Sequence, residues 1–129
     1  MSAGLGPQRL ARVLDHIESN IQQPLLLKDL AASVFLSPFH FARMFKESTG
    51  HPPHAFVRSR RVALACKLLQ DTGTPIIEVA RQCGFRTQSH FTGVFREIVG
   101  ITPNRYRATR PAEAVASPQQ AVTMANDPA

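Results

Sequence analysis

A stretch of 26 residues occurs twice in this chain, fifty residues apart. The segment FLSPFHFARMFKESTGHPPHAFVRSR, residues 35–60, aligns without a gap with FRTQSHFTGVFREIVGITPNRYRATR, residues 85–110. Eight positions carry the same residue in both copies: Phe35/Phe85, His40/His90, Phe41/Phe91, Phe45/Phe95, Glu47/Glu97, Gly50/Gly100, Pro53/Pro103 and Arg60/Arg110. Such agreement at one offset indicates two copies of a single supersecondary unit. The fold must therefore contain two similar units.

Apolar residues recur every three or four positions along most of the chain, a spacing typical of amphipathic helices. The clearest stripes are Leu10, Val13, Leu14, Ile17 and Ile21; Leu27, Leu30, Ala31 and Val34; and Ile76, Val79, Ala80 and Cys83. A longer helix over roughly residues 54–71 continues the same spacing. No segment alternates apolar and polar residues as a half-buried strand does, so the sequence predicts an all-α fold.

Prolines and glycines mark the expected ends of these helices. A hydroxyl residue precedes a proline where an N-cap and a first helical residue are expected, at Ser37, Thr74 and Thr102. A glycine follows an expected helix end at Gly50, Gly73 and Gly100. We expect a flexible N-terminus over residues 1–7 and an ordered part over 8–110. Residues 111–129, rich in Ala, Pro and Gln, are expected to form a disordered tail.

Basic residues are concentrated in the part expected to be ordered. All fifteen Lys and Arg lie between Arg9 and Arg110 together with seven of the nine acidic residues, which gives that segment a formal net charge of +8. Such an excess favours an anionic partner, either nucleic acid or a membrane surface. Composition alone leaves both open.

The two cysteines indicate a reducing compartment. Cys66 and Cys83 occupy apolar helix positions, so we expect reduced core residues and not a disulfide. The N-terminus lacks the apolar run of a signal peptide, and no stretch reaches the ~18 apolar residues that span a bilayer. The expected location is the cytoplasm, with no membrane partner.

A short amphipathic helix precedes each copy of the repeat, LKDLAASV before the first and PIIEVARQC before the second. Each unit is then a helix, a tight turn and a helix, and the second turn contains Gly84. In a basic protein this arrangement indicates a helix-turn-helix, whose first helix braces the second as it enters a DNA major groove. The alternative is a helical bundle that binds nothing. The duplication and the charge together favour DNA.

The segment GFRTQSHFTGVFREIVGITPNRYR, residues 84–107, carries GF, SHF, VF with a following basic residue, G, TP and YR in that order. These elements resemble the signature of the DNA-binding domain of the AraC/XylS family of bacterial transcription regulators. The resemblance covers about residues 8–110. It implies seven helices: a three-helix subdomain at 8–51, a linker helix at 54–71 and a second subdomain at 74–110.

The same resemblance has consequences for function. It implies one recognition helix per subdomain, the two entering successive major grooves about 34 Å apart, and activation through contact with RNA polymerase. Most family members carry a further domain, whereas a smaller group of the MarA and SoxS type consists of little more than this one. The sequence leaves open whether the chain is a stand-alone regulator or the C-terminal domain of a longer one.

The first recognition helix is expected from Pro38 to Thr49. Its outward positions Phe39, Ala42 and Arg43 match positions that contact bases in the resembling family. Arginine can donate two hydrogen bonds to guanine O6 and N7, and apolar side chains can contact thymine methyl groups. Phe39 could instead be a partly buried packing residue.

The second recognition helix is expected from Thr87 to Val99. Its outward residues are Gln88, Ser89, Thr92 and Gly93. Gln88 can read adenine with two hydrogen bonds, whereas Ser89 and Thr92 discriminate less. This helix should therefore select sequence more weakly than the first, or contact phosphates alone.

Gly93 lies opposite Arg43 in the repeat, where the family commonly has arginine. A helix-interior glycine costs about 0.5–1 kcal/mol relative to alanine. Either the helix approaches DNA closely at this point or a reading side chain has been lost, and we favour the second.

Phosphate contacts fix the register of a protein on DNA and make its affinity depend on salt. The backbone at the start of each recognition helix is one expected source, because helix N-termini attract phosphate. The candidates are Ser37, Lys46, Arg58, Arg60, Arg61, Thr87, Arg96, Arg105, Arg107 and Arg110.

One position departs from the family. Leu26 stands before the second helix, where a polar N-cap is usual, and its loss typically costs about 1 kcal/mol. Asp29 in the first turn could offset part of that through the helix dipole.

The sequence predicts a sequence-specific regulator that binds double-stranded DNA and not an enzyme, because no nucleophile–base pair, carboxylate pair or phosphate-binding loop is evident. No cofactor, metal or small-molecule site is expected, and the protein should associate with the bacterial nucleoid. Two alternatives remain: an architectural DNA binder without sequence preference, and a protein-interaction module whose basic face meets an acidic partner.

Overall fold

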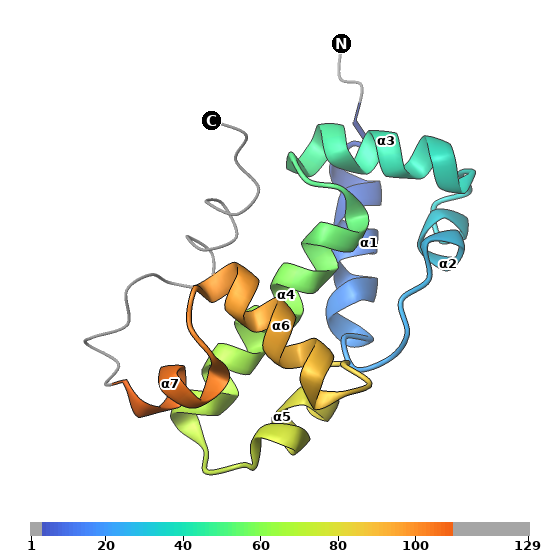
Figure 1. Ribbon diagram of the computed structural model, residues 1–129. Helices are drawn as coiled ribbons and strands as arrows, with labels where there is room; N and C mark the ends of the chain where they lie inside the picture. The colour runs from blue at the N-terminus through green and yellow to red at the C-terminus, as the bar shows by residue number, and fades with distance from the viewer. Residues whose placement is uncertain (1–3, 110–129) are drawn as a thin grey trace. The chain divides into compact units, whose positions relative to one another are not determined.

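The computed structural model describes residues 4–109, which form seven α-helices and contain no strand (Figure 1). The helices are α1 (Pro7–Ser19), α2 (Leu27–Ala32), α3 (Pro38–Thr49), α4 (Pro53–Asp71), α5 (Ile76–Gln82), α6 (Gln88–Val99) and α7 (Pro103–Ala108). The predicted all-α fold with seven helices is confirmed. Arg110 and the expected tail at 111–129 lie outside the described residues.

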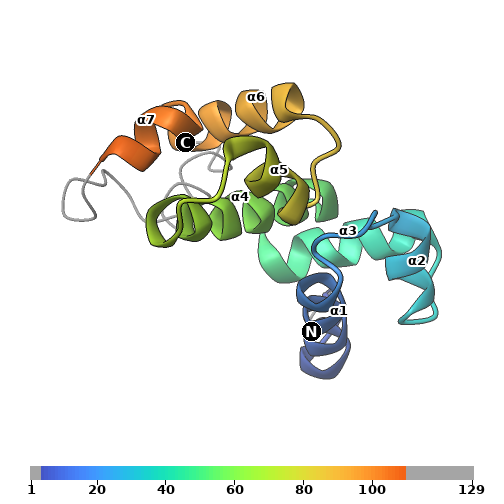
Figure 2. The same cartoon turned by 90° about the horizontal axis from the view of Figure 1, so that it is seen from below.

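The chain divides into two compact units, one ending at Val57 and the other beginning at Arg58. The first contains α1, α2, α3 and the start of α4, and the second contains the rest of α4 with α5, α6 and α7. Within the first unit α2 packs on α3, and within the second α5 packs on α6 (Figure 2). Each unit thus contains one helix-turn-helix pair.

The core of the first unit is built around two phenylalanines one turn apart on α3. Phe41 and Phe45 are fully buried, and their ring centroids lie 5.6 Å apart. Phe56, at the start of α4, meets Phe45 edge-on with its centroid 5.3 Å away. Val13 and Ile17 of α1 are also fully buried in this cluster, so the buried face of α3 is held between α1 and α4.

The N-terminal segment differs from the sequence expectation. Residues 1–7 were expected to be flexible, but α1 begins at Pro7 and Leu5 is buried in the first core. The backbone N–H of Leu5 donates to Ser48 Oγ at 2.7 Å, which ties the segment to α3. A single leucine outside the helical stripe gave no periodic signal.

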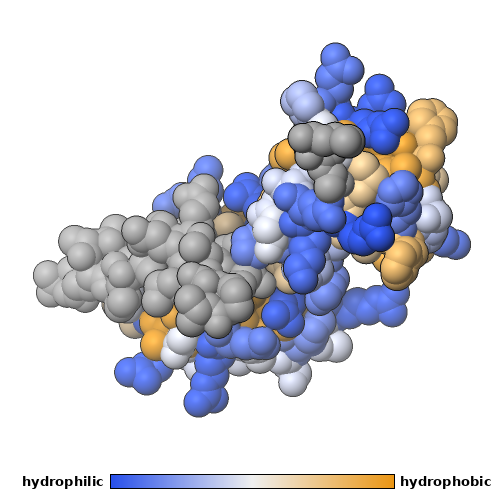
Figure 3. Space-filling model, turned by 90° about the horizontal axis from the view of Figure 1, so that it is seen from above, coloured by the Kyte–Doolittle hydropathy of each residue, from blue (hydrophilic) through white to orange (hydrophobic). Residues whose placement is uncertain are grey.

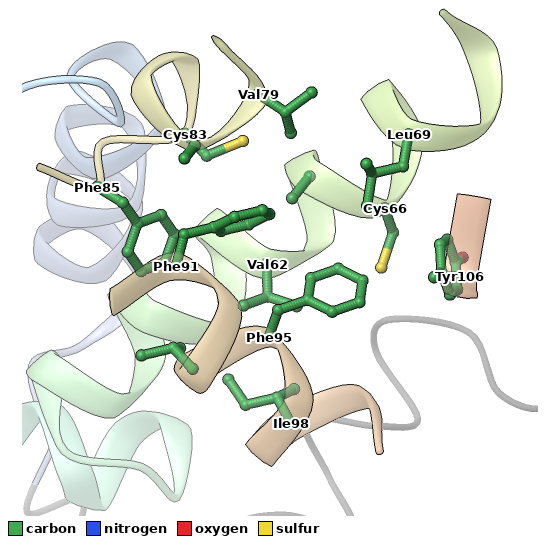
Figure 4. Packing of buried hydrophobic residues seen from close by; sticks show 13 residues of the cluster. Val62, Cys66, Leu69, Val79, Cys83, Phe85, Phe91, Phe95, Ile98 and Tyr106 are labelled. Carbon is green, nitrogen blue, oxygen red and sulfur yellow. The ribbon is translucent and has the colours of Figure 1, made fainter. Parts of the chain in front are cut away.

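The core of the second unit repeats this arrangement with a chain of aromatic rings (Figure 4). Successive centroids lie 5.2 Å apart from Phe85 to Phe91, 5.6 Å from Phe91 to Phe95 and 5.5 Å from Phe95 to Tyr106. Distances of this size are typical of favourable aromatic pairs. The chain of rings links the turn before α6 to α6 and α7.

Both cysteines are free and buried in the second core, as expected. Burial raises the pKa of the Cys66 thiol to about 11 and that of Cys83 to about 12. The Cys66 side chain lies beside Tyr106 (Figure 4), whose pKa burial raises to about 12. At neutral pH all three groups are protonated, so the thiols act as small apolar packing groups.

Side-chain caps begin three of the helices. Ser37 Oγ accepts from the N–H of His40 at 3.2 Å, Thr87 Oγ1 from His90 at 3.0 Å, and Thr102 Oγ1 from Arg105 at 3.3 Å. Each is a bond from the third helical residue back to the N-cap.

The other expected helix ends are partly correct. Gly50 and Gly100 end α3 and α6 in the left-handed conformation, with φ of 84° and 99°. The expectation for Thr74 was wrong: Pro75 itself is the N-cap of α5, and Thr74 Oγ1 lies 2.9 Å from Thr72 Oγ1. Gly73 follows α4 by two residues without a positive φ.

The turns of the two helix-turn-helix pairs differ in length. The N–H of Leu36 donates to Ala31 O at 3.0 Å, and the N–H of Phe85 donates to Ala80 O at 3.0 Å. The residue before each donor is left-handed, Phe35 with φ of 60° and Gly84 with φ of 87°.

The ungapped pairing of Phe35 with Phe85 is therefore wrong. The matching hydrogen bonds pair Phe35 with Gly84 and Leu36 with Phe85. The first turn is then one residue shorter than the second, counted from the accepting alanine to the N-cap. Phe35 is accordingly 87% exposed, whereas Phe85 is 6% exposed.

The start of α2 lacks a cap. Leu26 is the N-cap and makes no side-chain bond, and Asp29 lies in the first turn, both as the sequence indicates. We expect Leu26→Ser to raise the free energy of unfolding by about 1 kcal/mol, because the hydroxyl can accept an N–H of the first turn. Urea denaturation measures the change.

A matched control is Ile77→Ser, which also removes an exposed branched side chain but lies in the first turn of α5, two residues after the N-cap Pro75, and not at the N-cap itself. It should not stabilise the protein. Equal effects of the two substitutions would show that loss of exposed apolar surface, and not capping, determines the result.

Candidate nucleic-acid interface

The outer face of α3 carries the residues expected to read the first half of a DNA site. Phe39, Arg43 and Lys46 are exposed and Ala42 is half-buried. They follow one another at three- and four-residue spacing, so they share one side of the helix. The buried phenylalanines of α3 occupy the other side.

The outer face of α6 is polar and smaller. Gln88, Ser89, Gly93 and Arg96 are exposed, and Thr92 is half-buried. The opposite face is buried through Phe91, Phe95 and others of the second core. Both recognition helices therefore expose the face that the repeat and the periodicity indicated.

Gly93 lies at the centre of the exposed face of α6. A Cβ built on it meets no other atom within 4 Å. Its backbone is helical with no positive φ. Nothing in the described chain therefore requires glycine at this position.

The two helix starts offer similar surroundings to an anion. Ser37 and Thr87 are both exposed N-caps in extended conformation, and each hydroxyl accepts the N–H of its third helical residue. Pro38 has no N–H, so the first turn of α3 presents one donor fewer than that of α6. The positive end of the helix dipole is present in both.

The expected phosphate-binding side chains fall into two groups. Lys46, Arg96 and Arg105 are exposed. The half-buried group comprises Arg58, Arg60, Arg61 and Arg107. The exposed group can reach a phosphate without rearrangement, whereas members of the second group have contacts within the protein.

Arg58 and Arg61 illustrate the half-buried group. A terminal nitrogen of Arg58 lies 3.4 Å from Glu97 Oε1, on the outer side of α6. Burial lowers the pKa of the Arg61 guanidinium below its ordinary value, and the nearby Cys83 partly opposes this shift.

Arg107 has a structural role that the sequence did not reveal. Its Nε donates to Leu69 O at 3.1 Å, and a terminal nitrogen donates to Thr72 O at 3.4 Å. Leu69 lies in the last turn of α4 and Thr72 directly follows the helix, where a cation is favoured by the helix dipole. The contact joins residues more than thirty positions apart, which no local pattern indicates.

Two further residues near the helix starts were not among the expected contacts. Arg86 is exposed and immediately precedes the N-cap Thr87, a position that a search for basic residues near the cap would have found. Phe35 lies two residues before Ser37 and is exposed. Its exposure could not be predicted because the ungapped repeat pairs it with Phe85, a core residue.

Comparison with known proteins agrees with this geometry. A model of the helix-turn-helix domain matches residues 30–109. Over 97 residues the chain is 34% identical to the multiple antibiotic resistance protein MarA of Escherichia coli, with 75% of this chain and 76% of MarA covered. The chain belongs to the AraC-type helix-turn-helix family.

Other members of the AraC-type family extend the comparison. The probable transcriptional regulator LumQ of Photobacterium leiognathi is 35% identical over 102 residues, and the match covers 78% of this chain but 41% of LumQ. The DNA-binding domain of the transcriptional factor AdpA, solved in complex with a target DNA, superposes with a TM-score of 0.74 at 33% identity, covering 78% of this chain and 90% of that domain.

Among residues 4–109, none of the helices combines the length and the apolar character that a bilayer crossing requires.

Arg105 and Arg107 provide a matched pair that separates binding from folding. We expect Arg107→Ala to lower the free energy of unfolding by about 1–2 kcal/mol, because two charge-assisted bonds to carbonyls of α4 are lost. Arg105→Ala removes an exposed guanidinium and should leave stability within about 0.5 kcal/mol of the wild type. Urea denaturation of both variants, with circular dichroism as the signal, tests the difference.

The reverse result, with Arg105 the more costly residue, would contradict the capping role of Arg107.

Proposed function

We propose that this AraC-type chain is a sequence-specific, double-stranded DNA-binding regulator of transcription that places α3 and α6 in successive major grooves. The observation that supports this most directly is that both recognition helices bury an aromatic face and expose a polar or basic one. Net positive charge strengthens attraction to the phosphate backbone. Two relatives support the proposal: LumQ is described as a probable transcriptional regulator, and the DNA-binding domain of the transcriptional factor AdpA was solved in complex with a target DNA.

Base reading is assigned to the exposed faces. Arg43 donates two hydrogen bonds to a guanine, Phe39 and Ala42 contact thymine methyl groups, and Gln88 reads an adenine. Ser89 and Thr92 add weaker contacts, and Gly93 supplies none. The two half-sites are therefore unlike, and α3 provides more of the discrimination.

Phosphate contacts come from exposed cations and from the helix starts. Lys46, Arg96 and Arg105 have side chains in solvent, and Ser37 and Thr87 present helix N-termini. Arg58, Arg60, Arg61 and Arg110 complete the proposed set. Arg107 can contact a phosphate only if its guanidinium leaves the carbonyls of Leu69 and Thr72.

The proposed mode of regulation is activation through RNA polymerase, as in the family that the chain resembles. A chromosomal target places the protein in the bacterial cytoplasm at the nucleoid. No enzymatic activity and no cofactor are part of the proposed function. The competing functions are architectural binding without sequence preference and association with an acidic protein.

Selection from random-sequence DNA distinguishes these functions. A regulator should enrich a motif of two unlike half-sites about one helical turn apart. Binding without enrichment would support the architectural function, and absence of binding would support the protein-interaction function. Either of the last two outcomes would overturn the proposal.

Substitutions at Arg43 and Lys46 distinguish a contact to a base from a contact to a phosphate. Arg43→Ala should relax preference at one or two base pairs of the selected motif, with a loss of about 1–3 kcal/mol of discrimination. Lys46→Ala should weaken specific and random DNA equally and lower the salt slope of the affinity by about one. Titration at several salt concentrations measures both effects.

Arg81→Ala is the control, because Arg81 is paired with Glu78 on α5, a helix that carries none of the proposed reading or phosphate-binding residues. It should change neither quantity. Equal losses on specific and random DNA for Arg43→Ala would remove its reading role.

Gly93 tests whether a contact has been lost. Because a Cβ meets open space, Gly93→Ala should raise the free energy of unfolding by about 0.5–1 kcal/mol and leave DNA affinity unchanged or higher. Gly93→Arg should add a preference for guanine in the half-site of α6. If the alanine variant is more stable but binds more weakly, close approach of the backbone to DNA is the correct explanation.

A further inference from the structure

The turn between α2 and α3 contains a backbone conformation that its residue disfavours. Phe35 is the one residue other than glycine with a positive φ among residues 4–109. The left-handed conformation costs roughly 1–2 kcal/mol for a residue with a side chain, and bulky residues adopt it rarely. The corresponding position in the second unit is Gly84, which meets no such cost.

The side chain of Phe35 does not offset this cost within its own unit. It is 87% exposed, and no aromatic ring within the described part of the chain pairs with it. The other phenylalanines of the turn and α3 behave differently: Phe41 and Phe45 are fully buried. Phe35 thus has an exposed aromatic ring and a disfavoured backbone conformation, and neither stabilises the fold. Local exceptions of this kind are typical of functional sites.

A second exposed ring lies close by in the chain. Phe35 precedes the N-cap Ser37 by two residues, and Phe39, which is 79% exposed, follows it by two. These are the two most exposed large apolar side chains of the described residues. Figure 3 shows apolar surface among hydrophilic residues on the side of the first unit where Figure 1 places α2 and the start of α3. Two phenylalanines thus flank the start of the first recognition helix.

Three features favour DNA over a protein as the partner of this apolar pair. The start of a recognition helix is the part that reaches base edges. The same helix continues with exposed Arg43 and Lys46, which suit a polyanion and would repel a basic surface. The major groove also offers an apolar group at its edge, the C5-methyl of thymine.

We propose that Phe35 is an additional specificity-determining residue, whose ring contacts the methyl group of a thymine next to the base pair contacted by Phe39. The first unit keeps a disfavoured residue in its turn because the left-handed backbone directs this ring outward beside α3. The second unit, with Gly84 in the equivalent turn, makes no such contact. This inference rests on the proposed DNA-binding function and adds one contact to it.

Replacement of individual thymines by deoxyuridine provides a direct test, because only the methyl group is removed. In the motif selected by the wild-type protein, one such replacement should weaken wild-type binding about fourfold, the equivalent of about 0.8 kcal/mol for one buried methyl group. The same replacement should not change the DNA affinity of the Phe35→Gly variant. In Phe39→Ala, the methyl group of a second, neighbouring thymine should instead cease to affect the affinity.

Phe35→Gly and Phe35→Asn are both compatible with a left-handed backbone. Both should bind the thymine-containing site more weakly than the wild type, and Phe35→Gly should unfold at a higher temperature. Lower affinity together with higher thermal stability cannot arise from damage to the fold.

Two results would overturn the inference. One is unchanged affinity in both variants, and the other is an affinity loss that is the same for thymine and deoxyuridine at every position of the motif. Failure of the proposed function is distinguishable, because the wild-type protein would then select no motif at all.

Discussion

Each recognition helix is held in place by a pair of phenylalanines one turn apart. Phe41 and Phe45 on α3, and Phe91 and Phe95 on α6, are fully buried. Full burial of each ring contributes about 1.5–3 kcal/mol, so a rotation of either helix about its axis would expose two rings together. The caps fix where each helix begins and ends, because a hydroxyl N-cap precedes the first residue and a left-handed glycine follows the twelfth. The outer faces are therefore set by the cores beneath them.

The two units apply this constraint to different surfaces. On α3 the outer face carries an aromatic ring and two cations, whereas on α6 it carries short polar side chains, a glycine and one arginine. The buried pattern is the conserved part of the internal repeat, and the exposed pattern is the part that differs. This division fits a protein that uses one scaffold twice to meet two unlike stretches of its partner.

Much of the fold could be predicted from the sequence because periodicity and capping are local. The bounds of α3 agree with those expected, and α6 begins one residue later than expected. The uncapped start of α2 and the free, buried cysteines were likewise visible, since each depends on a residue type at a helix position. For the candidate site, the same periodicity identified which side chains face solvent.

The features that could not be predicted depend on three-dimensional pairing or on small differences in spacing. An identical residue at positions 35 and 85 hid the shorter turn, because an ungapped comparison rewards the wrong pairing. Thr74 failed as a cap because Pro75 takes the N-cap position itself. Leu5 and Arg107 reach their partners across tens of residues, and only the folded chain brings these groups together.

Because the space around Gly93 is empty, two constraints that usually limit substitution, side-chain packing and backbone conformation, do not act at this position. A core position cannot change without a cost in packing, and a strained loop cannot change without a cost in conformation. Position 93 has neither restriction, because its backbone is helical and its missing side chain would meet only solvent. The second unit can therefore acquire, lose or exchange a side chain here without refolding, so a single codon can change the outer face of this helix while the fold stays the same.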